Sequence, residues 1–124
     1  MRITLRQKNF KITPAFRTYM EQKIVRPAAR LLPANQEGDL PLFDIDVERT
    51  TGHHQKGPVY RVVANITLGR KVISAEATDE DPRAACDLLE DELKREIRSY
   101  KDKLRTLVKR GTRKVKGELR GGGL

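Results

Sequence analysis

The chain has 124 residues, of which 37% are hydrophobic and 35% are charged, and its net charge is +9. This is the size of one domain with a sizeable core, and the lack of any run of about 18 apolar residues excludes a membrane-spanning helix. A single cysteine, Cys86, excludes an internal disulfide, and the charged N-terminus is unlike a signal peptide, so we expect a cytoplasmic protein with no membrane partner.

The first quarter of the chain predicts a strand followed by a helix. Residues 2–6 alternate between apolar and polar side chains, which is the pattern of a half-buried strand. Thr13 and Pro14 suit the cap and the first position of a helix. The helix then carries an apolar stripe at three- and four-residue steps, made of Phe16, Tyr19, Met20 and Ile24. Pro27 is expected to end or kink this helix near Arg26 because proline has no N–H to donate.

Three further strands and a long helix are predicted in the remainder. Residues 42–49, 59–68 and 71–77 alternate like the first strand. An acidic segment with Pro82 then opens a helix, because carboxylates and an early proline favour helix N-termini. Its apolar stripe consists of Ala85, Leu89, Leu93, Ile97, Tyr100, Leu104 and Leu107. Gly111 is expected to end this helix.

The order β-α-β-β-β-α predicts an α+β fold. We expect a four-stranded sheet with the three later strands antiparallel and two helices packed on one face. The last five elements follow the order of double-strand-RNA-binding domains. Residues 1–110 should form one domain and residues 111–124 a flexible basic tail. A helix over residues 82–110 would be about 43 Å long, so its final turns should project past a body about 35 Å across.

The positive charge is concentrated at the C-terminal end. Residues 101–124 hold nine of the 26 basic and two of the 17 acidic residues, which leaves a net charge of only +2 on residues 1–100. Such asymmetry favours a polyanionic partner, most often nucleic acid, over a merely solubilising tail. At 100° per residue, one side of the last helix changes from Asp87 and Asp91 to a basic row of Lys94, Arg98, Lys101, Arg105 and Lys109. Cations near a helix C-terminus also favour its dipole, but five in line suit RNA phosphates better.

Two other groups of polar residues are candidate sites. His53 and His54 lie between glycines in a predicted hairpin loop, and neighbouring strand residues point to opposite faces, so a metal site is not expected. His54 and Lys56 are instead candidates for a phosphate or base contact, with a plain solvent-exposed loop as the alternative. The carboxylates of Asp44, Asp46 and Glu48 share a strand face at about 6.6 Å spacing, as paired catalytic or magnesium-binding groups could.

No nucleophile and no phosphate-binding glycine loop accompanies those carboxylates. We therefore expect no enzyme, no metal and no cofactor. Cys86 falls on the apolar side of its helix, which indicates a core residue rather than a reactive thiol.

The sequence resembles the ribosome hibernation promoting factors, also called ribosome-associated translation inhibitors. Residues 1–24 are similar to the family's opening strand, Asn-Phe corner and Thr-Pro helix start, and residues 59–105 to its paired strands, acidic helix start and Ala-Ala-x-Asp turn. The resemblance implies a non-catalytic factor that binds small-subunit rRNA in the path of mRNA and tRNA and inhibits translation. It also implies a short form, monomeric off the ribosome, without the ribosome-dimerising domain of long members.

Basic places of the family are matched in both helices. The residues at those places are Lys23, Arg26, Arg95, Arg98, Lys101 and Lys103. Glu92 and Ser99 stand where the family usually has lysine, which implies a contact shifted toward Lys94 and the tail. Two other hypotheses stay open: a general RNA-binding protein or RNA chaperone, which would not prefer small subunits over free duplex RNA, and a small hydrolase using the carboxylate strand.

Overall fold

Four strands form one mixed sheet whose order in space is their order in the chain. The computed structural model of the protein describes residues 2–32, 41–51 and 57–121, with side chains through residue 107 except that of residue 51. The strands are β1 (Arg2–Lys8), β2 (Leu42–Thr51), β3 (Pro58–Leu68) and β4 (Lys71–Asp79). The β2–β3 and β3–β4 pairs are antiparallel, as the sequence predicts. β1 pairs with β2 in parallel because a helical crossover returns the chain between them.

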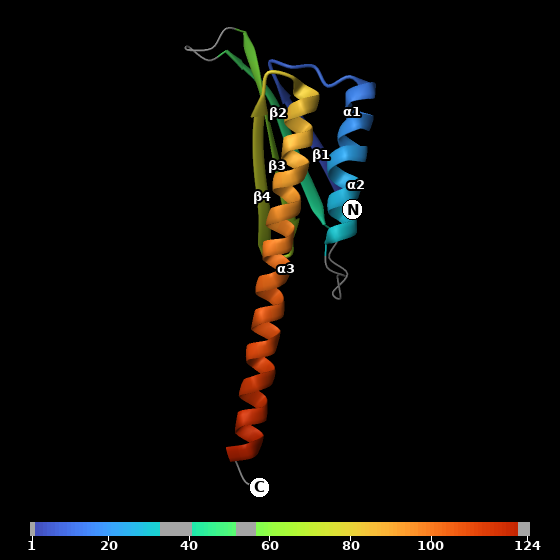
Figure 1. Cartoon of the computed structure of the whole chain (residues 1–124). Coiled ribbons are helices and arrows are strands. Elements are labelled where there is room, and N and C mark those ends of the chain that lie inside the picture. The colour runs from blue at the N-terminus through green and yellow to red at the C-terminus, as the bar shows by residue number, and fades with distance from the viewer. Residues whose placement is uncertain (1, 33–40, 52–56, 122–124) are drawn as a thin grey trace.

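The helices lie together on one face of this sheet (Figure 1). The first is a continuous rod of α1 (Pro14–Met20), the π-helical turn η1 (Glu21–Val25) and α2 (Arg26–Leu31), and the second is α3 (Pro82–Gly121). Both rods start at the same end of the sheet and run in the same direction. The predicted α+β class, the element order and the placement of both helices are therefore confirmed.

The core lies between the helix layer and the sheet. Alternate strand residues such as Phe43, Ile45 and Val62 have no exposed surface, and neither do Leu89 and Ile97 of α3. The predicted stripes and strand faces are thus the ones that the fold buries, except that Leu104 and Leu107 at the end of the α3 stripe are exposed. Burial of side chains of this size stabilises a fold by about 1.5–3 kcal/mol each.

The start of the first helix follows the sequence, but its continuation differs. The Thr13 hydroxyl accepts a hydrogen bond from the Phe16 amide at 3.1 Å, which confirms the cap. The helix does not end near Arg26. It widens to a π-turn in which the Arg26 amide bonds to the Glu21 carbonyl, and it then continues through Pro27. The wider turn relieves the clash that a proline ring makes with the carbonyl four residues earlier.

The last helix is longer than predicted. α3 begins at Pro82 as expected, but it continues through Gly111 to Gly121, so the predicted stop at Gly111 is wrong. Glycine in a helix costs only about 1 kcal/mol relative to alanine, and helix formation is cooperative, so one glycine does not terminate it. Figure 1 shows that the second half of α3 projects well past the sheet. The sequence predicts such a projection because the helix is longer than the body is wide.

Candidate nucleic-acid interface

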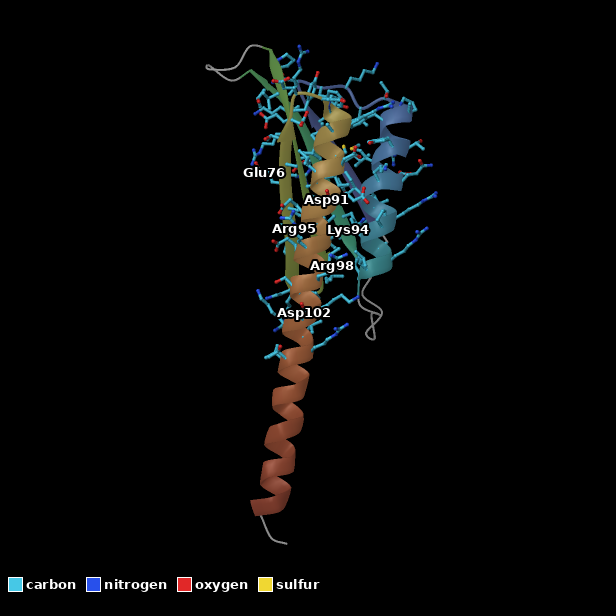
Figure 2. All side chains as sticks on the ribbon, in the orientation of Figure 1. Glu76, Asp91, Lys94, Arg95, Arg98 and Asp102 are labelled. Carbon is cyan, nitrogen blue, oxygen red and sulfur yellow. The ribbon has the colours of Figure 1, made fainter. Side chains whose placement is uncertain are left out.

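The predicted basic residues lie in the helix layer. Lys23 is exposed in η1 and Arg26 is exposed at the start of α2. On α3 the exposed cations are Arg95, Arg98, Lys103 and Arg105, while Lys94 and Lys101 are half-buried. Figure 2 shows Lys94 on the flank of α3 that faces α2 and Arg95 on the flank that faces β4.

Ion pairs within α3 occupy two of these cations. The Lys94 ammonium lies 2.8 Å from a Glu90 carboxylate oxygen, and an Arg95 guanidinium nitrogen lies 3.0 Å from Glu92. Within residues 2–32, 41–50 and 57–107, the other predicted cations form no ion pair: Lys23, Arg26, Arg98, Lys101, Lys103 and Arg105. These six are therefore the ones whose charge is available to a polyanion.

The basic residues of the first rod and those of α3 lie on neighbouring helices. α2 and η1 pack against α3, and α2 lies beside the middle of α3 (Figure 1). The parallel course of the two helices thus brings two separate basic segments of the sequence to one end of the layer.

Arg30 extends this basic surface, although the sequence analysis missed it. It is exposed in the last turn of α2, one helical turn beyond Arg26. The spacing of four residues from Arg26 is the signal that could have identified it. It went unnoticed because Pro27 was expected to end or kink the helix before that turn.

The acidic residues at the opposite end have structural partners. The Asp79 carboxylate accepts a hydrogen bond from the Asp81 amide at 2.9 Å, and the Asp81 carboxylate accepts one from the Arg83 amide at 3.1 Å. Both bonds satisfy amides at and just before the start of α3 that the helix itself leaves free. Asp87 accepts a hydrogen bond from the Tyr19 hydroxyl at 2.7 Å. The acidic side chains at this end of the layer therefore cap α3 and join it to α1.

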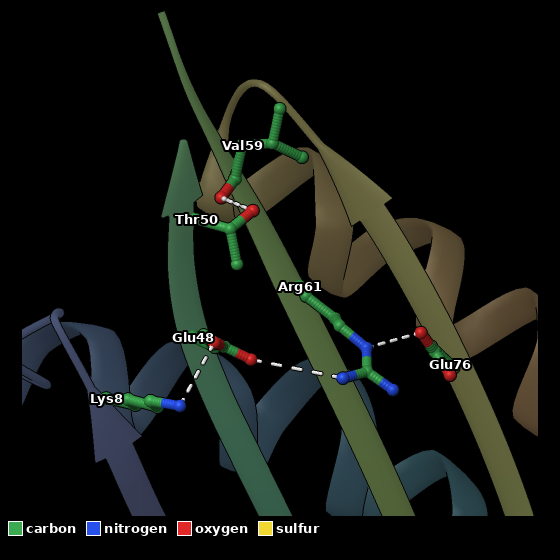
Figure 3. Close-up of polar contacts among 6 residues, drawn as sticks. All are labelled: Lys8, Glu48, Thr50, Val59, Arg61 and Glu76. Atoms are coloured by element: carbon green, nitrogen blue, oxygen red, sulfur yellow. Dashed lines mark hydrogen bonds and ion pairs between the residues drawn. The ribbon is translucent and has the colours of Figure 1, made fainter. Parts of the chain in front are cut away.

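The outer face of the sheet carries alternating charges in place of a basic patch (Figure 3). Glu48 lies 3.6 Å from the Lys8 ammonium and 3.9 Å from the Arg61 guanidinium, which also bonds to Glu76. That bond lowers the pKa of the Glu76 carboxyl and raises the pKa of Arg61. A balanced ladder of this kind gives no net attraction for phosphates.

The candidate catalytic carboxylates belong to this outer face. Asp44, Asp46 and Glu48 alternate with the buried residues of β2, and Glu48 is held in the ion pairs with Lys8 and Arg61. Within the described part of the chain, no three histidine, cysteine or acidic side chains are placed to hold a metal ion. The fold therefore uses Glu48 in the ladder that joins neighbouring strands.

Cys86 is a core residue, as the sequence predicts. Its side chain has no exposed surface, and burial raises the pKa of its thiol to about 12. His54 and Lys56 fall in residues 52–56, outside the described residues. The side chain of Lys109 is also outside them, as are residues 122–124 of the predicted tail.

Comparison with known proteins identifies relatives of this fold. A family model described as "Sigma 54 modulation protein / S30EA ribosomal protein" matches residues 3–105. A ribosomal subunit interface protein from Coxiella burnetii is 25% identical with a TM-score of 0.62, and the match covers 82% of this chain and 99% of that one. The N-terminal domain of Thermus thermophilus Protein Y is 26% identical with a TM-score of 0.58, covering 81% and 99%. No helix in the described residues is both long and apolar enough to cross a membrane.

Proposed function

This chain belongs to the Sigma 54 modulation protein / S30EA ribosomal protein family, and we propose that it is a hibernation factor that binds rRNA of the small ribosomal subunit and inhibits translation. The observation that carries the proposal is the basic end of the helix layer. There, Arg26 of α2 and Arg98 and Lys101 of α3 are free of carboxylate partners within the described residues. A ribosome-binding role would place the protein in the cytoplasm.

The proposed mechanism is occupation of a site on RNA, with no chemical step. Unpaired arginine and lysine side chains displace counterions from phosphates, which gives affinity without reading base sequence. Specificity for one place on the subunit would then come from the shape of the helix layer. We assign the contact to this helix surface, with Lys23, Arg26, Arg30, Lys94, Arg95, Arg98, Lys101, Lys103 and Arg105. A protein seated in the path of mRNA and tRNA inhibits translation by excluding both.

A co-sedimentation experiment with separated small and large subunits at two salt concentrations tests this proposal. The variant Arg26→Gln, Arg98→Gln, Lys101→Gln removes three charges from the helix surface. It should lower affinity for the small subunit by at least tenfold at moderate salt and relieve inhibition of translation in vitro. The matched control is Arg2→Gln, Arg6→Gln, Lys71→Gln, which removes three charges from exposed residues of the sheet. This control should bind and inhibit like the unaltered protein.

Two results would contradict the proposal. Equal binding to both subunits and to free duplex RNA would indicate a general RNA-binding protein. Equal losses in the helix variant and the sheet control would show that net charge alone, and not this surface, drives binding.

A further inference from the structure

The part of α3 beyond the sheet forms a helical arm, which we define as residues 104–121. At 1.5 Å per residue it is about 27 Å long. Leu93 and Ile97 are 1% and 0% exposed against the sheet, but Leu104 is 36% and Leu107 is 63% exposed, so the helix leaves the body at this point. The family match ends at residue 105, and the arm therefore lies almost entirely beyond it.

The arm continues the basic row of the body. Counted at 100° per residue, the positions of Lys109, Lys116 and Arg120 fall on the same flank of α3 as Lys94 and Arg98. In Figure 2 this is the flank on the side of α2. We call Lys109, Lys116 and Arg120 the first row.

A second row begins where the sheet ends. The positions of Lys103, Arg110 and Lys114 lie about 120° around the helix from the first row, on the flank toward β4. Along the body this flank carries Glu92 and Glu96, and the one cation beside them, Arg95, is paired with Glu92. The body thus has one basic row of unpaired cations, whereas from Lys103 onward α3 has two, with the position of Arg113 at an angle between them.

We propose that the arm lies between two phosphate backbones of folded, double-stranded RNA, with one row on each backbone. The proposal rests on the proposed function and extends it to a second contact outside the body. A single backbone can engage one flank of a helix but leaves a second row 120° away in solvent. The minor groove of an RNA duplex is wide and shallow and is bounded on each side by a sugar–phosphate backbone, so a helix lying over it has one line of negative charge on each flank.

Helix energetics favour a phosphate partner for the arm. Like charges four residues apart destabilise a helix by about 0.2–0.5 kcal/mol per pair, and the arm has such pairs at 105/109, 109/113, 110/114 and 116/120. Phosphates on both flanks would remove this repulsion. A membrane surface fits less well, because the apolar positions of the arm form a narrow stripe without an aromatic residue and with Gly111 and Glu118 within it. A second copy of the chain would bring two strongly basic arms together.

Binding of the full-length protein to a blunt RNA duplex and to small subunits, each across a range of salt, tests the proposal. The first-row variant is Lys109→Gln, Lys116→Gln, and the second-row variant is Arg110→Gln, Lys114→Gln, so neither variant changes a residue assigned to the body surface. Glutamine keeps helix propensity close to that of lysine and arginine, and circular dichroism checks that the helix is retained. The sheet variant Arg2→Gln, Lys71→Gln removes the same number of charges and is the control.

Each row variant should reduce the slope of log affinity against log salt by about 0.9 per lost phosphate contact, and the variant that combines all four substitutions by the sum. The sheet control should keep the original slope. An effect of one row alone would overturn the two-backbone geometry, and no effect of either row would overturn RNA binding by the arm. Binding to anionic lipid vesicles that Leu104→Gln, Leu107→Gln abolishes, with RNA binding unchanged, would assign the arm to a membrane instead.

The same measurements separate this proposal from the proposed function. If the variant Arg26→Gln, Arg98→Gln, Lys101→Gln loses small-subunit binding while both row variants keep it, the body surface stands and the arm proposal fails. If the row variants lose binding while that body variant keeps it, the arm proposal stands and the proposed body surface fails.

Discussion

Tyr19 joins the two helices near the acidic end of the layer. Its hydroxyl donates a hydrogen bond to Asp87 of α3, and the Arg83 guanidinium lies 5.2 Å from the centroid of its ring. The hydrogen bond to Asp87 raises the pKa of Tyr19 to about 12, because ionisation would break the bond and place a phenolate beside a carboxylate. Asp87 is therefore an acceptor that positions the helices relative to each other.

The variant Tyr19→Phe should lose this hydrogen bond and keep the ring beneath Arg83. We expect the free energy of unfolding to fall by about 1 kcal/mol or less, because the bond is exposed. Tyr19 ionises near pH 10 in the unfolded chain and near pH 12 in the folded one, so its contribution is complete below pH 10 and is lost as pH rises through 12. Urea unfolding of both proteins across this range should show the difference between them shrinking. A difference that stays constant up to pH 12 would contradict the assigned bond.

At the scale of single elements, both helices continue through residues that commonly end helices. The π-turn allows Ile24 and Val25, which are neighbours in the chain, both to be 1% exposed in the core. The first helix thereby shifts its apolar stripe by one position before Pro27 and still packs on the sheet. In α3 the helix passes through Gly111. Helix formation is cooperative, so the helical turns on both sides of this glycine keep it helical.

The variant Gly111→Ala distinguishes a helix that passes through this position from one that ends there. In a continuous helix, alanine should increase helix content and favour the helical state by about 1 kcal/mol. If Gly111 were a left-handed stop, alanine would be strained and helix content would not rise. Circular dichroism of the full-length protein during mild heating measures the change. Gly69→Ala is the control. Gly69 has a φ of 59° in the β3–β4 turn, which alanine adopts only with strain, so this substitution should lower the free energy of unfolding of the protein.

At the scale of the whole molecule, charge is separated along the axis of the helix layer. Residues that cap α3 make one end acidic, and the opposite end carries the unpaired cations of α2 and α3 and leads into the arm (Figure 1). The outer face of the sheet is balanced by its ladder of ion pairs. Such a distribution orients the molecule toward a polyanion with its basic end first.

Lysine acetylation of the protein, alone and bound to ribosomes, tests this orientation. Lys23 and Lys101 should be protected from the reagent in the complex, because the proposed surface faces RNA. Lys8 and Lys71, which belong to the sheet, should react equally in both states. Mass spectrometry of the digested protein gives the extent of modification at each position. Protection of the sheet lysines with continued reaction of Lys23 and Lys101 would reverse the proposed orientation.

The sequence predicted the features that depend on near neighbours in the chain. The cap at Thr13, the strand faces around Phe43 and Ile45 and the burial of Cys86 follow from residue type and periodicity. The basic row of α3 followed from the same 100° spacing. Arg30 was missed because Pro27 was expected to end or kink the helix near Arg26, whereas the π-turn lets the helix continue through both residues.

By itself, the sequence determined the order of elements, the side of each element that is buried and the concentration of charge near the C-terminus. Only the tertiary structure decided the parallel pairing of β1 with β2, the bond between Tyr19 and Asp87 and the placement of two basic segments at one end of the helix layer. Periodicity is a property of a few consecutive residues, so it can be read from the chain. Pairing and juxtaposition depend on how elements far apart in sequence share one core, and no single segment contains that information.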